Sequence, residues 1–210
     1  MPPGEDRREL VARLRSEIRR LERRPERRSG AIPCGLPAID ALLPGGFPCG
    51  AISELRGGRA SGKTIVALSL LAGLERGALA AWIDVRGELY PPAAAALGVE
   101  LDRLLIVRPP GGARGGAGLW AAEALLGSGA FAAVVMDDPE GPPSRGAEVG
   151  LRRLVAAAEQ GGTVGLWLSL PGAALRPPAA LRLAIETRAG QIIARPGGRR
   201  PGADGASHAA

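Results

Sequence analysis

Eight consecutive residues, from Gly57 to Thr64, have the types and the spacing needed to bind a nucleoside triphosphate. They read Gly-x-x-x-x-Gly-Lys-Thr, the pattern of a phosphate-binding loop. Glycines let backbone N–H groups converge on phosphate oxygens, and a helix N-terminus behind the loop adds partial positive charge. We expect Lys63 to reach the β- and γ-phosphates, and Thr64 to bind Mg²⁺ through its hydroxyl. The predicted nucleotide-binding residues of this loop are Gly57, Gly58, Arg59, Ala60, Ser61, Gly62, Lys63 and Thr64.

The sequence around the loop supports this interpretation. A short strand is predicted at 51–55, and a helix at 65–74 whose apolar residues at helical spacing are Ile65, Leu68, Leu71 and Leu74. Lys63 is also the only lysine among 27 lysine and arginine residues, so this position selects a compact ammonium over a planar guanidinium. The alternative is an accidental match in a chain with 32 glycines. ATP or ADP with Mg²⁺ is therefore the predicted cofactor.

Two further residues are candidates for the same site. An apolar strand predicted at 130–137 ends in Asp137, whose carboxylate is placed to orient the magnesium shell directly or through water. Tyr90 is the only tyrosine and follows the strand predicted at 79–85, so it is a candidate to stack on the adenine base. The alternative is a surface tyrosine that precedes Pro91 and Pro92.

Apolar runs of strand length alternate with helical segments along the rest of the chain. Further strands are predicted at 104–107 and 163–170, and helices at 91–97, 119–126 and 147–160. Near-continuous apolar strands favour an α/β fold with a mainly parallel sheet and helices on both faces. The segments 181–187 and 191–195 flank Arg188, Ala189 and Gly190, which predicts an antiparallel C-terminal hairpin.

The N-terminal segment has a different composition. Residues 1–30 hold ten arginines and six acids, and 5–24 is predicted to form a separate amphipathic helix. Its one narrow apolar stripe is predicted to bind a partner, and the alternative is a solvated surface helix. The stripe consists of Leu10, Leu14, Ile18 and Leu21. The predicted organisation is a basic helix in 1–30, a core in 31–195 and a disordered tail in 196–210.

Composition limits the other classes of function. The net charge of +6 permits weak contact with single-stranded DNA, although an arginine-rich genome would give the same balance. Cys34 and Cys49 lack metal-ligand spacing and are predicted to be buried thiols of a reducing compartment. No apolar run reaches the ~18 residues that span a bilayer. A cytoplasmic protein without a membrane partner is therefore expected.

The order of the motifs resembles RecA-type recombinases over residues 31–195. The matching segments are 35–40 (Gly-Leu-Pro-Ala-Ile-Asp), 57–64, Trp82-Ile83-Asp84, 97–105 (Leu-Gly-Val-Glu-Leu-Asp-Arg-Leu-Leu), 128–130 and the strand that ends at Asp137. The resemblance implies a RecA-like core with a phosphate-binding loop.

The same resemblance exposes three departures. Arg86 stands where the recombinases have the glutamate that polarises the attacking water, and Glu88 enters a predicted turn, where it is not expected to take that place. Leu170 stands where they have a glutamine that senses the γ-phosphate. The segment 171–178 is short where theirs grips single-stranded DNA. Nucleotide binding with little or no ATP hydrolysis is therefore expected, because the general base is missing.

A more specific resemblance is to the ImuA family of mutagenesis cassettes. It is carried by the basic N-terminal helix, the lead-in at 35–46, the trimmed core and the terminal hairpin. It implies a RecA-like accessory protein of SOS-induced translesion mutagenesis, associated with the nucleoid during DNA damage. The implied partners are RecA, ImuB and an error-prone replicative-type polymerase, and a second copy of this chain is a further candidate. The alternatives are a DNA-dependent ATPase or recombinase and a SulA-like cell-division inhibitor.

Overall fold

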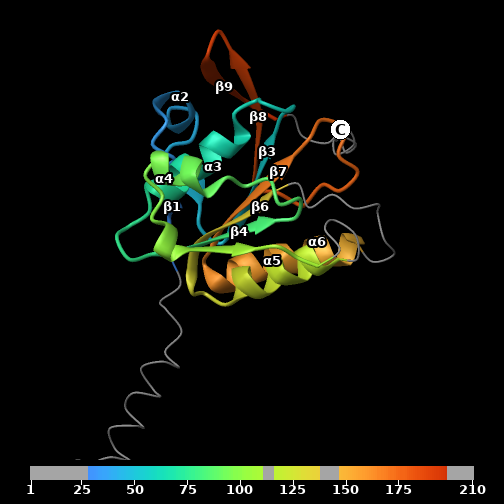
Figure 1. Cartoon of the computed structure of the whole chain (residues 1–210). Coiled ribbons are helices and arrows are strands. Elements are labelled where there is room, and N and C mark those ends of the chain that lie inside the picture. Colours follow the sequence, from blue (N-terminus) through green and yellow to red (C-terminus); the bar gives the residue numbers. More distant parts are fainter. Residues whose placement is uncertain (1–27, 111–115, 138–146, 198–210) are drawn as a thin grey trace, which may run out of the picture.

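A seven-stranded sheet forms the centre of the protein, in the order β5-β4-β6-β7-β3-β8-β9 (Figure 1). The computed structural model describes residues 28–110, 116–137 and 147–197. The strands are β3 (Ala51–Arg56), β4 (Leu79–Asp84), β5 (Leu104–Val107), β6 (Phe131–Asp137), β7 (Val164–Ser169), β8 (Leu181–Arg188) and β9 (Gln191–Pro196). Neighbours run parallel except β8 and β9, which form the predicted antiparallel hairpin. A separate two-stranded sheet pairs β1 (Ala31–Ile32) with β2 (Phe47–Pro48).

Helices cover both faces of the large sheet (Figure 1). One face carries α2 (Pro37–Asp40), α3 (Lys63–Ala72) and α4 (Pro91–Ala96), and the opposite face carries α5 (Ala117–Gly127) and α6 (Ala147–Gly161). A short 3₁₀ turn, Leu101–Arg103, leads into β5. The predicted α/β fold with a mainly parallel sheet, helices on both faces and a C-terminal hairpin is confirmed.

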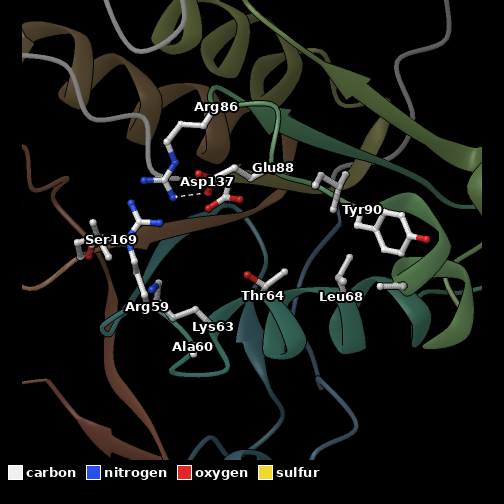
Figure 2. A pocket seen from close by; sticks show the side chains of 13 residues that line it. Arg59, Ala60, Lys63, Thr64, Leu68, Arg86, Glu88, Tyr90, Asp137 and Ser169 are labelled. Carbon is white, nitrogen blue, oxygen red and sulfur yellow. Dashed lines mark ion pairs between the residues drawn. The ribbon is translucent and has the colours of Figure 1, made fainter.

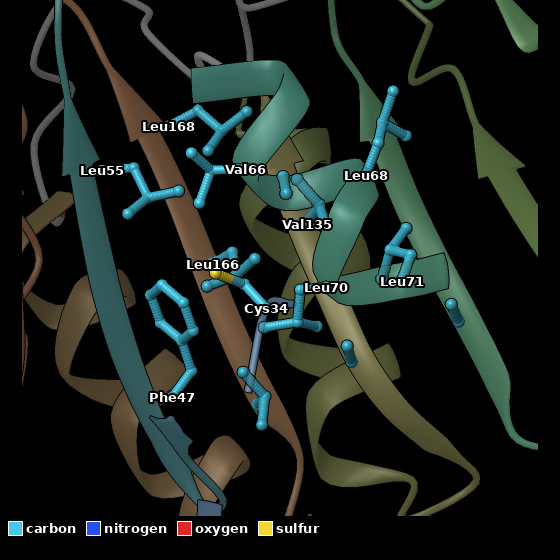
Figure 3. Close-up of a cluster of buried hydrophobic side chains, with 14 of the residues drawn as sticks. Cys34, Phe47, Leu55, Val66, Leu68, Leu70, Leu71, Val135, Leu166 and Leu168 are labelled. Atoms are coloured by element: carbon cyan, nitrogen blue, oxygen red, sulfur yellow. The ribbon is translucent and has the colours of Figure 1, made fainter. Parts of the chain in front are cut away.

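Each central strand contributes side chains to two hydrophobic cores, because successive residues of a strand point to opposite faces. In β7, Leu166 packs under α3 while Trp167 packs under α5 and α6. The core beneath α3 contains Cys34, Phe47 and Leu70 (Figure 3). Burial on both faces explains why these strands read as continuous apolar runs.

The helix after the phosphate loop differs from its prediction in one respect. It begins at Lys63, and its buried residues are Val66, Ala67, Leu68, Leu70 and Leu71. Ile65, predicted to be in the apolar stripe, is 43% exposed. The helix packs on the sheet through a buried arc that is wider than one stripe, and Ile65 lies outside this arc.

The predicted N-terminal helix with Leu10, Leu14, Ile18 and Leu21 lies outside the described residues, as does the tail beyond residue 197. The predicted division of the chain into three segments therefore stays a prediction. Among the described residues, none of the helices has the length and apolar composition needed to cross a bilayer.

Candidate nucleotide-binding site

The phosphate loop is held between β3 and the N-terminus of α3 by close packing of its glycines. Gly62 is the N-cap of α3 and has a left-handed backbone, with φ of +93°. A Cβ on Gly57 would lie 2.4 Å from the carbonyl oxygen of Ile185 in β8 and 2.4 Å from Oγ of Ser61. Glycine is therefore required at both positions, for different reasons. Residue 62 needs the backbone angle, and residue 57 needs the space.

Lys63 lies across the loop. Its Nζ donates hydrogen bonds to the carbonyl oxygens of Gly57, at 2.7 Å, and Gly58, at 2.9 Å. The ammonium group of Lys63 thus stabilises the curved backbone of the loop. We expect the same cation to bind phosphate oxygens in the loop.

The carboxyl ends of β3, β4, β6 and β7 meet at one edge of the sheet, where a cavity of about 290 Å³ opens. The volume is near the lower end of the range for small-molecule sites, about 300–1,000 Å³. Lys63, Thr64 and Asp137 all line it (Figure 2). The structure therefore brings together the predicted phosphate ligand and both predicted magnesium ligands, although they come from distant segments.

The other predicted nucleotide-binding residues divide into two groups. Gly57, Gly58, Ser61 and Gly62 of the loop are not among the residues that line this cavity. Arg59 and Ala60 line it from the loop, and Tyr90 lines it from the start of α4 with 67% of its surface exposed. A tyrosine that is open on one side can stack on a base, and no described contact fixes it in that role. Leu170, predicted to take the place of the sensing glutamine, also lines the cavity.

Glu88 is a cavity residue that the sequence reasoning did not place here. Its backbone N–H donates to Oδ1 of Asp84 at 2.9 Å, and the N–H of Leu89 donates to Oδ2 at 3.3 Å. The Asp84 carboxylate, only 1% exposed and also bound by Nε of Arg108 at 3.0 Å, therefore folds the turn after β4. This turn brings Glu88 into the cavity. An acid at a strand end before a glycine turn is the signal that could have indicated it.

Arg86 enters the cavity beside Glu88 (Figure 2). Its guanidinium forms an ion pair with the Glu88 carboxylate, 2.9 Å from Nη2 to Oε2. The two side chains are 33% and 49% exposed, so the pair is reached by solvent and is worth about 0–1 kcal/mol. Arg86, which is predicted to stand where the recombinases have a glutamate, thus contacts Glu88 in the same cavity.

A buried charge network joins β3 to the segment after β7. Glu54 is 1% exposed and accepts hydrogen bonds from Oγ of Ser169, at 2.9 Å, and from the guanidinium of Arg182. Arg176 pairs with the same carboxylate at 3.6 Å. The short segment 171–178 is therefore anchored to the strand that leads into the phosphate loop. Sequence patterns did not reveal this network, because its members are far apart along the chain.

The described residues contain no cluster of three or more histidine, cysteine or acidic side chains that could hold a metal ion. Mg²⁺ commonly takes one or two protein ligands together with phosphate oxygens and water, and the Thr64 hydroxyl and the Asp137 carboxylate in the cavity are oxygen donors of that kind. Thr64 and Asp137 are the residues that would hold it.

Both cysteines are free thiols. Cys34 is buried as predicted, whereas Cys49 is only partly buried. Burial, assisted by the Asp40 carboxylate that accepts a hydrogen bond from the thiol, raises the pKa of Cys34 to about 11.

Comparison with known proteins adds a family to this geometry. The family model for the RecA N-terminal domain matches residues 14–141, a range that contains the phosphate loop and Asp137. Protein RecA of Levilactobacillus brevis is 46% identical over 108 residues, which are 50% of this chain and 28% of that protein. Protein RecA of Enterococcus faecalis is 41% identical over 125 residues, which are 59% of this chain and 35% of that protein. The chain therefore spans about a third of the length of these relatives.

Proposed function

Since the chain belongs to the RecA N-terminal domain family, we propose that it is a nucleotide-binding accessory protein of DNA-damage-induced translesion mutagenesis, of the ImuA type. It binds ATP or ADP with Mg²⁺, hydrolyses little or none of it, and acts through contacts with other proteins. One observation carries this proposal: a complete phosphate-binding set, formed by Lys63, Thr64 and Asp137, shares its cavity with the Arg86–Glu88 ion pair.

The binding half of the proposal rests on the geometry of the loop. Lys63 Nζ already lies within hydrogen-bond distance of two loop carbonyls, and Thr64 and Asp137 face the same cavity. The proposed low turnover rests on two other residues of the cavity, Arg86 and Leu170. Arg86 occupies the position of the water-polarising glutamate of the recombinases, and Leu170 cannot hydrogen-bond a γ-phosphate.

The proposed partners are RecA, ImuB, an error-prone replicative-type polymerase and a second copy of this chain. The apolar stripe of Leu10, Leu14, Ile18 and Leu21 is the proposed contact element. The described core offers a second surface: Trp120 on α5 is 70% exposed and Val149 on α6 is 60% exposed. Large exposed apolar side chains on adjacent helices are typical of protein-binding surfaces.

Nucleotide titration tests the proposed nucleotide binding. Wild type is expected to bind ATP and ADP, and Lys63→Ala to weaken binding about ten- to hundredfold, because a hydrogen bond to a charged group is worth about 1.5–3 kcal/mol. Tyr90→Ala measures the proposed stacking on the base. Arg153→Ala is the matched control, since Arg153 pairs with Glu123 on the exposed α5–α6 surface. Brisk hydrolysis by wild type, abolished by Lys63→Ala, would contradict the proposal.

Co-purification with RecA and with ImuB tests the proposed contacts with partner proteins. The double variant Leu14→Asp with Ile18→Asp is expected to lose partner binding and to keep its nucleotide affinity. Each apolar side chain buried in a partner groove contributes about 1.5–3 kcal/mol, so two charges in the stripe remove the main contact. A double variant that retains both partners would show that the contact surface lies on the core.

A DNA-dependent ATPase remains the second candidate, and the presence of Glu88 in the cavity favours it. The anchored segment 171–178 argues against a strong DNA grip: Arg176 pairs with buried Glu54, and Leu175 is itself buried. Weak, salt-sensitive binding to single-stranded DNA through arginine–phosphate contacts is therefore proposed. Turnover measured with and without single-stranded DNA separates the two candidates.

A further inference from the structure

Two acidic side chains line the nucleotide cavity within the described residues, and the proposed function uses one of them. Asp137 ends β6 and is assigned to Mg²⁺. Glu88 comes from a different element, the turn between β4 and α4, and has no assigned role. A carboxylate in a phosphate-binding cavity has a cost, because it repels the anionic ligand. Its presence there calls for a chemical explanation.

We propose that Glu88 is a general base for ATP hydrolysis whose carboxylate is held by Arg86, so that the chain is a latent ATPase. The proposal rests on the proposed nucleotide binding. In the reaction, the oxygen of a water molecule bonds to the γ-phosphorus while the bond from that phosphorus to the bridging oxygen breaks. ADP leaves with the electron pair, and Glu88 accepts the proton that the water loses. The products are ADP and inorganic phosphate, and the proton then passes to solvent.

The backbone of Glu88 is held in place by hydrogen bonds, as the role of a general base requires. Its N–H donates to the carboxylate of Asp84, which is 1% exposed and bound also by Leu89 and Arg108. A general base must be held within hydrogen-bond reach of the proton it removes, and a turn fixed by a buried carboxylate provides such a support. Glu88 therefore differs from a surface glutamate whose backbone is free.

Arg86 explains why turnover is low. Its guanidinium lies 2.9 Å from Oε2 of Glu88, so this carboxylate oxygen already accepts a charge-assisted hydrogen bond. While that contact is made, the oxygen is occupied by the guanidinium and is not open to an attacking water molecule. The pair is partly exposed, and partly exposed ion pairs contribute little to folding. Loss of this pair is therefore expected to leave the protein folded.

The experiment measures ATP turnover and nucleotide affinity in wild type, Arg86→Ala, Arg86→Met and the double variant Arg86→Ala with Glu88→Gln. Both single variants are expected to raise turnover at least tenfold, since a positioned general base contributes about 10²–10⁴-fold to a rate. The double variant is expected to return to the wild-type rate while keeping the nucleotide affinity of Arg86→Ala. Arg153→Ala, which removes another partly exposed ion pair outside the cavity, is expected to leave turnover unchanged.

Unchanged turnover in both single variants, with nucleotide still bound, would overturn the inference and leave the proposed function intact. A rise in turnover that survives Glu88→Gln would also overturn it, because the base would then be another group. Failure of wild type to bind nucleotide in the same titration would overturn the proposed function and the inference with it. The affinity measurement therefore distinguishes the two failures.

Discussion

The phosphate loop offers a direct test of the packing argument, because two adjacent glycines have opposite environments. At Gly57 an added Cβ would lie 2.4 Å from the carbonyl oxygen of Ile185 and 2.8 Å from Cβ of Ser61. At Gly58 an added Cβ would meet nothing within 4 Å. Gly57→Ala and Gly58→Ala therefore make the same chemical change in one loop, and only the first one clashes.

The expected magnitudes follow from these contacts. Real Cβ atoms essentially never approach another heavy atom closer than 3.0 Å, so the Gly57→Ala loop must move away from β8. The carbonyl of Ile185 is part of the sheet backbone and cannot rotate aside. Forcing an extra methyl group into a packed site costs about 1–3 kcal/mol. Gly58→Ala meets no clash and restricts the unfolded chain, which stabilises by about 0.4–1 kcal/mol where the backbone allows it.

Thermal unfolding measures the difference. For a domain of this size 1 kcal/mol shifts Tm by about 2–4 °C, so Gly57→Ala is expected to lower Tm by about 2–12 °C, whereas Gly58→Ala leaves it equal or slightly higher. Nucleotide affinity of Gly57→Ala is expected to fall too, because its carbonyl anchors Lys63. Equal Tm values for the two variants would refute the close packing of the loop on β8.

Two further predictions concern the buried polar groups. Arg182→Met removes one partner of the Glu54 carboxylate, which is 1% exposed and keeps only Ser169 and the more distant Arg176. The free energy of unfolding, measured by chemical denaturation, is therefore expected to fall by about 3 kcal/mol. The matched change Arg188→Met breaks only an exposed pair and is expected to cost about 0–1 kcal/mol; equal costs would contradict the network. The Cys34 pKa is raised from 9.0 to about 11 in the folded state, so its thiol favours folding below pH 9, and this contribution is lost as the pH rises toward 11. Wild type should therefore lose stability more steeply than Cys34→Ala across that range, and parallel pH curves would contradict this.

Local patterns were sufficient to predict the sheet, and to indicate that Lys63, Thr64 and Asp137 share one cavity. The loop motif fixes a strand before Gly57 and a helix after Gly62, and an acid at the end of a buried strand indicated Asp137. In a parallel sheet both strand ends lie at the same edge, so their side chains meet in one cavity. The sheet and the shared cavity could be predicted because each depends on a few consecutive residues and on one rule of topology.

The features that were missed depend on contacts between distant residues. Glu88 reaches the cavity because the buried carboxylate of Asp84 folds the intervening turn, and no spacing rule specifies that turn. The local sequence of β3 gives no sign that Glu54 is buried. It is buried because Arg182 and Ser169 compensate its charge from β8 and β7. Periodicity describes one element at a time, whereas compensation of a buried charge requires the neighbouring elements to be known.

The strongest physical reason for the proposed function is that the cavity residues proposed to bind the nucleotide and those proposed to limit its hydrolysis come from different strand ends. Lys63 and Thr64 begin α3, which follows β3, and Asp137 ends β6, whereas the departures from the recombinase pattern, Arg86 and Leu170, follow β4 and β7. In the proposed function, binding and turnover therefore depend on different strand ends, and one can change without the other. A nucleotide that is bound but rarely hydrolysed acts as a lasting ligand. At a hundred times its Kd it stabilises the folded state by about 2.7 kcal/mol. In this protein that free energy would hold the phosphate loop, and through Glu54 the segment 171–178, in a single conformation that a partner can recognise.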